Sequence, residues 1–158
     1  MFYRLPVLLL AFLVLRAGAA EHSVSSAAEI SQVAPSLLPG DVVILREGVW
    51  NDQRIVIEAR GNTTSPITFR AASSGTTLLQ GDSSLKIQGE HLRVEGLWLK
   101  DATSSDAGIE VRGSDCRVTA CAVTGGAHRN YLRLWGTRHR IDHSHFSGKT
   151  GDAPTVQI

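Results

Sequence analysis

A pattern repeated three times between residues 85 and 149 constrains the fold of this chain more than any other feature. The copies begin at Leu85, Ile109 and Leu132, which are 24 and 23 residues apart. Repeats of this length, with short runs and glycine punctuation, are typical of stacked architectures. The matching columns are Leu85, Ile109 and Leu132; Ile87, Val111 and Leu134; Gly89, Gly113 and Gly136; Arg93, Arg117 and Arg140; Val94, Val118 and Ile141; and Leu99, Val123 and Phe146.

Within each copy, apolar and polar residues alternate in three short runs separated by bends. Alternation with a period of two indicates strands, and no copy contains an apolar stripe with helical spacing. Three strands in each copy predict one coil of a parallel β-helix, with successive coils about 4.8 Å apart. An antiparallel meander or sandwich is the less favoured alternative. It calls for hairpin turns of the Asn-Gly or Asp-Gly type, which the chain lacks.

The first 20 residues have the pattern of a secretion signal. Arg4 supplies positive charge, residues 5–15 form an apolar run and residues 17–20 are all small. The run is shorter than the roughly 20 apolar residues that cross a bilayer, which disfavours the alternative of a membrane anchor. We therefore expect residues 1–20 to be a signal peptide, cleaved after Ala19 or Ala20, and the protein to be secreted or periplasmic.

The net charge argues against two classes of partner. The whole chain carries a formal charge of +1, and loss of Arg4 and Arg16 with the signal leaves about −1. A nearly neutral chain has no electrostatic attraction toward nucleic acid or anionic membranes. We expect neither as a partner once the signal is removed.

The two cysteines, Cys116 and Cys121, fall in inward columns of the repeat. Two cysteines in a chain of this length do not form a disulfide framework. We interpret them as small buried hydrophobic residues, with a local disulfide as the alternative. Their spacing does not fit a CxxC or metal-binding motif.

The segment that precedes the repeats contains the one place where a helix fits. Residues 24–38 are loosely amphipathic, with Ser25 or Ser26 as a cap and Pro35 near the end. A helix there would cover the open end of the stack. Strands are expected around residues 42–45, 55–57 and 67–70, and Asn62 begins a glycosylation sequon by pattern only. Residues 21–158 are therefore expected to form one continuous stack.

The joint pattern of the mature chain resembles the amino-terminal part of the chondroitinase B and alginate lyase family of polysaccharide lyases. That resemblance implies an exported, right-handed, single-stranded parallel β-helix of the pectin-lyase type. It also implies β-elimination on uronate-containing polysaccharides such as alginate or dermatan sulfate, usually with a bound calcium ion. The resemblance rests on residues 48–50 (Gly-Val-Trp), 61–71 (ending in Pro-Ile-Thr-Phe-Arg-Ala), 81–89, 94–99, 140–143 (Arg-Ile-Asp-His) and 146–149 (Phe-Ser-Gly-Lys).

The residues that this chemistry requires do not occur together in the chain. β-Elimination needs a group that neutralises the uronate carboxylate, a base and an acid. The family's calcium ligands include a Glu-x-Glu pair, whereas Glu110 is the last glutamate here, and only Asp142 and Asp152 lie in the final coil. We therefore assign no catalytic residue and no metal ligand, and expect calcium in full-length members but none bound by this fragment.

Three residues are candidates for contact with an acidic polysaccharide. Lys149 matches the family's Gly-Lys position, and His143 and His145 lie at and beside a corner of the last coil. For each of the three, the alternative is an ordinary solvated side chain without a role in binding. His139 falls in an inward column and is expected to be partly buried and hydrogen-bonded.

Other prominent side chains have simpler interpretations. Lys86, Glu110 and Arg133 form an outward column of alternating charge, which stabilises neighbouring strands by about 0.2–1 kcal/mol per pair. Single tryptophans on a solenoid usually serve packing, although they can stack on sugar rings. The tryptophans are Trp50, Trp98 and Trp135.

The last residues continue the repeat. Val156 and Ile158 follow Leu132 and Leu134 by 24 residues each, so residues 155–158 are expected to form the first strand of a further coil. An open apolar end predicts end-to-end self-association. The favoured function is the amino-terminal part of an exported polysaccharide lyase, inactive as this fragment. The alternative is a non-catalytic carbohydrate-binding or structural β-helix module.

Overall fold

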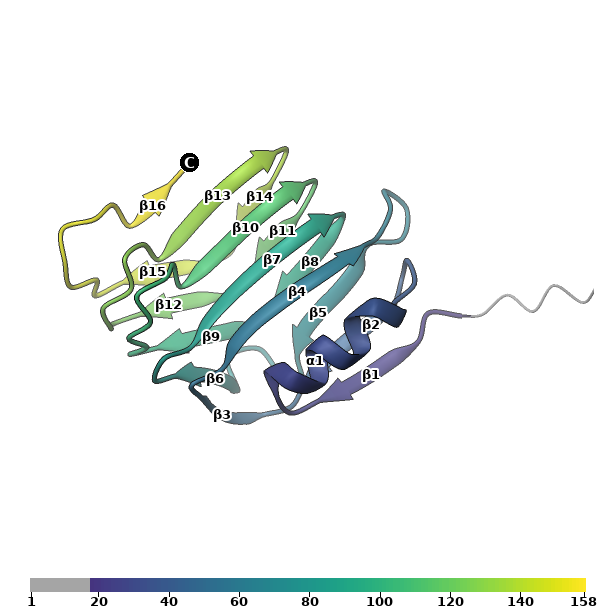
Figure 1. Ribbon diagram of the computed structural model, residues 1–158, viewed down its shortest axis with the longest axis horizontal. Coiled ribbons are helices and arrows are strands. Elements are labelled where there is room, and N and C mark those ends of the chain that lie inside the picture. Colours follow the sequence, from purple (N-terminus) through teal and green to yellow (C-terminus); the bar gives the residue numbers. More distant parts are fainter. Residues whose placement is uncertain (1–17) are drawn as a thin grey trace, which may run out of the picture.

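The computed structural model describes residues 18–158, which form a parallel β-helix (Figure 1). Each pair of neighbouring strands runs parallel, as predicted, so the antiparallel sandwich is wrong. Residues 1–17, which hold most of the predicted signal peptide, lie outside the described part. Among residues 18–158, no helix has both the length and the apolar character needed to cross a membrane.

The strands belong to three sheets, which we call A, B and C. Sheet A contains β1 (Glu21–Val24), β2 (Val42–Leu45), β5 (Ile67–Ala71), β8 (Leu92–Glu95), β11 (Arg117–Thr119) and β14 (Arg140–Asp142). Sheet B contains β3 (Gly48–Asn51), β6 (Thr77–Gln80), β9 (Leu97–Lys100), β12 (Ala122–Thr124) and β15 (His145–Ser147). Sheet C contains β4 (Arg54–Arg60), β7 (Ser84–Glu90), β10 (Ile109–Ser114), β13 (Leu132–Thr137) and β16 (Val156–Gln157).

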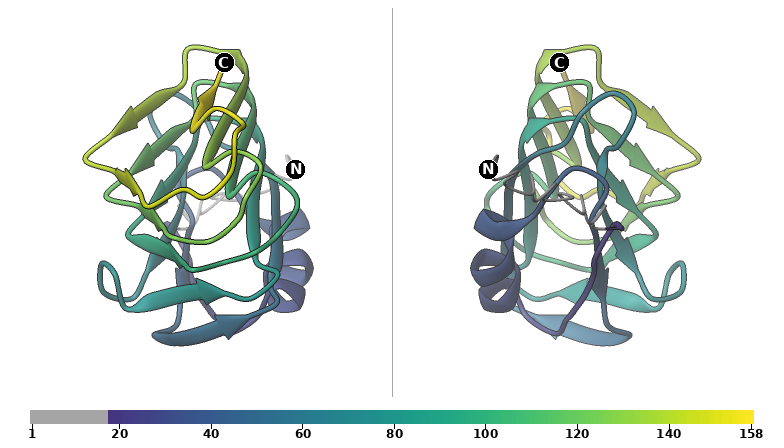
Figure 2. Two further views of the ribbon diagram at one scale, coloured as in Figure 1. Left: turned by 90° about the vertical axis from the view of Figure 1, so that its left-hand side faces the viewer. Right: turned by 90° about the vertical axis from the view of Figure 1, so that its right-hand side faces the viewer.

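The chain visits the sheets in the order A, B, C and then returns to A. From β2 onward each turn adds one strand to each sheet, which gives five three-stranded turns, and the first turn contributes only β1, to sheet A. Successive turns stack in sequence order, from the purple and blue amino-terminal turns to the yellow last turn (Figure 2). Residues about 24 positions apart are thereby brought side by side.

The repeat predicts the strand register correctly. Ile109 pairs with Leu85 on one side and with Leu132 on the other. Val118 likewise lies between the corresponding residues of the neighbouring turns. The final strand also follows the prediction, because β16 places Val156 beside Leu132. Val156 remains 42% exposed, and end-to-end association through this edge stays a prediction.

A short helix lies at the amino-terminal end of the stack, as predicted, but it is shorter than expected. It consists of α1 (Ala27–Val33), followed by one 3₁₀ turn (Ala34–Ser36) in which Pro35 prevents continuation of the α-helix. Ser26 caps it, because its hydroxyl accepts a hydrogen bond from the backbone nitrogen of Glu29 at 3.2 Å. Ile30 is fully buried, so the helix closes this end of the core beside β4.

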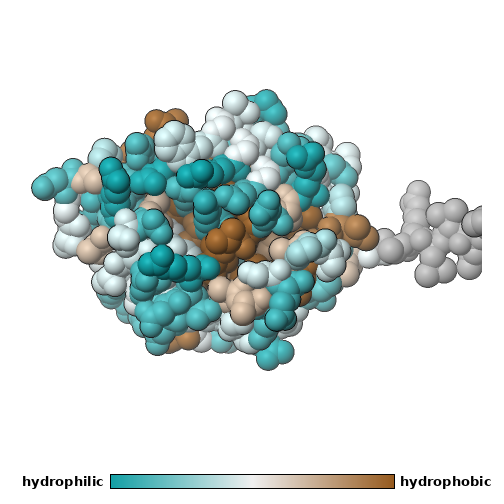
Figure 3. All heavy atoms as spheres, in the orientation of Figure 1, coloured by the Kyte–Doolittle hydropathy of each residue, from teal (hydrophilic) through white to brown (hydrophobic). Residues whose placement is uncertain are grey.

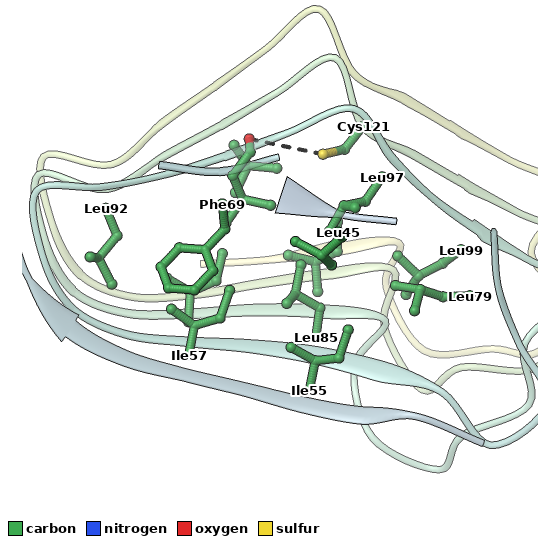
Figure 4. Packing of buried hydrophobic residues seen from close by; sticks show 14 of the residues in the cluster. Leu45, Ile55, Ile57, Phe69, Leu79, Leu85, Leu92, Leu97, Leu99 and Cys121 are labelled. Atoms are coloured by element: carbon green, nitrogen blue, oxygen red, sulfur yellow. Dashed lines mark hydrogen bonds between the residues drawn. The ribbon is translucent and has the colours of Figure 1, made fainter. Parts of the chain in front are cut away.

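The core is a continuous apolar column inside the three sheets. Branched and aromatic side chains from successive turns, among them Phe69, Ile57 and Leu45, meet in its interior (Figure 4). Cys121 points into this column, with its Sγ near the carbonyl oxygen of Val94. Both cysteines are buried and free, so the alternative of a local disulfide is wrong.

A column of glycines lies near the carboxyl ends of the sheet C strands β7, β10 and β13. Gly89, Gly113 and Gly136 have φ values of +139°, +115° and +115°, a region that glycine alone adopts readily. A Cβ atom on Gly113 would overlap the carbonyl oxygen of Gly89, and one on Gly136 would overlap that of Gly113. The glycine column therefore lets successive turns approach closely at this bend.

Candidate functional site

The outer face of sheet C carries two rows of side chains that run along the stack. Strand pairing aligns Val56, Lys86, Glu110 and Arg133 in the first row. The second row contains Glu58, Gln88, Arg112 and Trp135. Because side chains on one face of a strand are two residues apart, both rows face the solvent together.

Glu110 is the anionic centre of this face. Its carboxylate lies 2.6 Å from the Nε of Arg112, 3.2 Å from the Nη1 of Arg133 and 3.9 Å from the Nζ of Lys86. Burial works to raise the pKa of Glu110, but the hydrogen bonds and positive charges of these neighbours outweigh it and lower the pKa. Glu110 therefore remains ionised and leaves the cluster with a net positive charge.

The three cations differ in how free they are to meet a ligand. Arg133 also donates to the Oδ1 of Asn130 at 2.8 Å and to the Oε1 of Gln157 at 3.2 Å, and its side chain is only 17% exposed. Lys86 is 37% exposed, whereas Arg112 is 49% exposed and has Glu110 as its one hydrogen-bond or ion-pair partner among residues 18–158. Arg112 is therefore the cation best placed to bind an anion from solution.

A pocket of about 350 Å³ lies over the first row. Sheet C forms its floor, and Asp106 and Ala107 from the loop of residues 101–108 form a wall. Arg54 stands at the border, where its Nη2 donates to Asp82 at 2.6 Å and its Nη1 lies 3.9 Å from Asp106. Figure 3 shows this face in space-filling form, with a small brown apolar patch bordered by teal hydrophilic side chains.

Buried side chains support the loop that forms the wall. His128 and Tyr131 are almost completely buried, and their rings meet edge to face with centroids 6.3 Å apart. The hydroxyl of Tyr131 donates to the carbonyl oxygen of Gly125 at 2.6 Å. Gly108 lies directly against His128, where a larger residue would be crowded. These contacts fix the position of the wall relative to β10 and β13.

The tryptophans divide into different environments. Trp50 is 5% exposed and serves packing, as expected. Trp98 is half-buried, and its Nε1 donates to the Oγ1 of Thr124 at 2.7 Å. Trp135 is 49% exposed on the outer face of sheet C, directly beside Arg112. An exposed aromatic ring beside an arginine can pack against a sugar ring while the cation binds a carboxylate.

Comparison with known protein families decides the relationship. The sequence profile described as chondroitinase B matches residues 24–158. The chain belongs to the chondroitinase B family. It is therefore a member of a polysaccharide lyase family, as the sequence motifs indicated. Comparison with curated proteins gave no match.

Solved structures agree with this family relationship. The PL6 family alginate lyase AlyGC is 31% identical and superimposes with a TM-score of 0.81 over 87% of this chain. A PL6 family polysaccharide lyase from Pseudopedobacter saltans is 25% identical, with a TM-score of 0.82 over 87% of this chain. A mannuronic acid specific family 6 lyase from human gut microbiota is also 25% identical, with a TM-score of 0.65 over 80% of this chain. The chain spans 21% of the first structure and 34% of each of the other two.

The histidines proposed for substrate contact lie outside the sheet C pocket. His143 occupies the corner after β14 with a φ of +51°, and its Nδ1 lies 3.5 Å from the Oδ1 of Asp142. His145 points outward from β15 on sheet B, and its Nε2 lies 2.9 Å from the Oγ of Ser147. Both are exposed, and their contact with a polysaccharide stays a prediction.

Lys149 also lies away from the pocket. It follows β15, and its Nζ donates to the carbonyl oxygen of Gly151 at 3.1 Å. No hydrogen bond or ion pair within residues 18–158 joins it to either histidine candidate, and its role in binding stays a prediction. His139 is partly buried, as predicted, and its Nδ1 accepts a hydrogen bond from the backbone nitrogen of Cys116 at 3.4 Å.

The acidic residues of the last turns do not fit the family's calcium ion. Asp142 accepts hydrogen bonds from Arg117 at 2.8 Å and from Arg140 at 2.5 Å. Its pKa is strongly lowered, first by a hydrogen bond from Thr119 and then by Arg117. Within residues 18–158 no group of three histidine, cysteine or acidic side chains could hold a metal ion. We therefore derive no calcium-dependent step for these residues.

Proposed function

We propose that this chain supplies the first, polysaccharide-binding turns of an exported lyase that acts on an acidic, uronate-containing polysaccharide. The observation that carries the proposal is the pairing of exposed Arg112 with exposed Trp135 on sheet C, above a cluster with excess positive charge. The family relationship and the alginate lyase named among the similar structures support the substrate class.

The chemistry of the pocket supports binding of the polymer. A uronate carboxylate would pair with the guanidinium of Arg112, and the sugar ring would pack on the indole of Trp135. Strand spacing places equivalent side chains of successive turns about 4.8 Å apart, so a polymer along the stack would meet one turn after another. Such a polymer would compete with Glu110 for Arg112.

Proton abstraction is not a role that the pocket favours. Glu110 has a lowered pKa and is held by three cations, so it is a weak base. In our proposal, β-elimination takes place on further turns of a longer protein. Calcium belongs to that longer protein as well, and the chain alone should show no eliminase activity on alginate or dermatan sulfate. Growth of the ultraviolet absorbance of unsaturated uronate products would contradict this.

The binding proposal is tested by replacing Arg112 with alanine. We expect Arg112→Ala to weaken binding of alginate oligosaccharides about tenfold or more in isothermal titration, because it removes one charge-assisted contact of about 1.5–3 kcal/mol. Arg140→Ala is the matched control. Arg140 likewise donates its Nε to a carboxylate two residues away, but it lies on sheet A.

The outcomes separate the alternatives. Loss of affinity in Arg112→Ala but not in Arg140→Ala supports the sheet C site, and added salt should weaken the parent's binding. Equal losses in both variants would show that only overall charge matters. Unchanged affinity in Arg112→Ala would refute this site as the binding face.

A further inference from the structure

A buried carboxylate lies next to the predicted processing site. Asp41 is 5% exposed, and its Oδ1 accepts a hydrogen bond from the backbone nitrogen of Ala20 at 2.8 Å. Its Oδ2 accepts a second bond from the backbone nitrogen of Leu38, also at 2.8 Å. The one ion-pair partner of Asp41 among the described residues is His22, whose Nε2 lies 3.8 Å from Oδ2. Asp41 is therefore a buried anion with no Lys or Arg partner among residues 18–158.

Ala20 is held in place from both of its backbone groups. Its nitrogen points at Asp41, and its carbonyl oxygen accepts a hydrogen bond from the backbone nitrogen of Val42 at 2.9 Å. The next residue, Glu21, begins β1 and pairs with β2. Gly18, Ala19 and Ala20 are all exposed, so the peptide bond before Ala20 is open to a protease.

We propose that the precursor is processed at the Ala19–Ala20 bond and that the new α-ammonium group of Ala20 becomes the ionic partner of Asp41. Hydrolysis consumes one water, breaks the bond between the Ala19 carbonyl carbon and the Ala20 nitrogen, and leaves a carboxylate on Ala19. The freed amine takes up a proton at neutral pH. A neutral N–H donor is thus replaced, at the same position, by a charged one, and the hydrogen bond to the Asp41 carboxylate becomes an ion pair.

The structure distinguishes between two cleavage points that the sequence leaves open. Cleavage after Ala20 would remove the donor to Asp41 and also the carbonyl that Val42 binds. Cleavage after Ala19 keeps both contacts. Small residues occupy the positions that signal peptidases require for either cleavage point, Ala17 and Ala19 or Gly18 and Ala20, so the contacts of Ala20 decide between them. The inference rests on the proposed export, because only an exported precursor is processed in this way.

The test begins with the complete chain, which is expressed with its own predicted signal peptide in a host that can export it. Mass spectrometry should show that the secreted protein begins at Ala20. The rate of acylation of its α-amine should then be measured against pH in the folded state. Since a neighbouring carboxylate favours the charged amine, the pKa should lie about one unit above the ordinary range near 7.7–8.0, and labelling at pH 7 should be about tenfold slower than in Asp41→Asn.

Two controls complete the experiment. His22→Gln retains Asp41 and should label as slowly as the parent. The pH profile of the parent alone gives the pKa even if Asp41→Asn fails to fold. A mature start at Glu21, or an α-amine pKa within or below the ordinary range, would overturn the inference while leaving export intact. If the chain is not exported, export itself fails, and release of Ala20 from a fusion by a specific protease still tests the pairing with Asp41.

Discussion

The glycine column on sheet C offers a sharp test of how the turns are stacked, and Gly113→Ala is the informative change. Gly113 has a φ of +115°, and a Cβ atom there would overlap the backbone of Gly89 in the preceding turn. Two costs follow. Holding a non-glycine residue in this backbone region costs about 1–3 kcal/mol. Moving the carbonyl of Gly89 out of the way disrupts inter-turn hydrogen bonding, at about 1–3 kcal/mol more.

Gly48→Ala is a control that isolates the second cost. Gly48 has a similar φ of +125°, but a Cβ atom there would meet nothing within 4 Å. Both variants therefore carry the backbone strain, and only Gly113→Ala carries the overlap. We expect Gly113→Ala to lower the free energy of unfolding by about 3–5 kcal/mol and Gly48→Ala by about 1–3 kcal/mol.

Urea unfolding followed by circular dichroism measures both values under one set of conditions. The difference between the two variants should be about 2 kcal/mol, which is the cost of displacing the backbone of the preceding turn. Equal destabilisation by the two substitutions would refute the close approach of Gly113 to Gly89. It would show that the backbone conformation alone requires glycine.

Three further predictions concern the core, the charges and the thiols. Val111→Asp should cost several kcal/mol, because it buries a charge between Ile87 and Leu134, and an unchanged thermal midpoint would show that the register is wrong. The hydrogen bond from Arg138 lowers the pKa of Asp115 to about 2. The ion pair between Asp115 and Arg138 therefore contributes fully to stability above the ordinary carboxyl pKa near 4, and this contribution is lost as the pH falls toward 2. Urea unfolding at pH 5 and pH 3 should therefore show lower stability at pH 3, and equal values would contradict it. Burial raises the pKa of Cys121 to about 11, so its thiol should resist alkylation at pH 8 until the protein is unfolded. Rapid alkylation of Cys121 in the folded protein would contradict its burial.

The sequence predicted the stacked core well because one physical constraint acts three times. Inward positions such as Val111 must be apolar in every turn, so a repeat of apolar columns determines both the strand type and the register. The same argument extends to Val156, although that strand is only two residues long. The prediction weakened where the repeat is absent.

The amino-terminal end shows that weakness. β1 was not predicted, because Glu21–Val24 is short, mostly polar and stabilised by pairing with β2 rather than by its own pattern. The helix was predicted with Ser25 or Ser26 as its cap, which the structure confirms for Ser26, but the predicted segment extended too far toward Leu38. Its true start is determined by the cap at Ser26, and its end by the 3₁₀ turn that contains Pro35.

The candidate site was only partly visible in the sequence. The column of Lys86, Glu110 and Arg133 was interpreted as sheet stabilisation, and its ion pairs bear this out. The pocket above it depends on Asp106, which comes from a loop without any repeat pattern. The exposure of Trp135 could not be read from its residue type, because Trp50 has the same type and is buried.

Hydroxyl-radical footprinting most directly tests whether an acidic polysaccharide lies along sheet C. Exposed side chains would be oxidised with and without alginate oligosaccharide and quantified by mass spectrometry. We predict protection of Trp135 and Val56, which are 49% and 41% exposed on sheet C. Val49, which is 54% exposed on sheet B and is not a candidate for polysaccharide contact, serves as the internal reference and should react equally in both samples. Protection of His145 with unchanged oxidation of Trp135 would place the polymer on sheet B and contradict binding along sheet C.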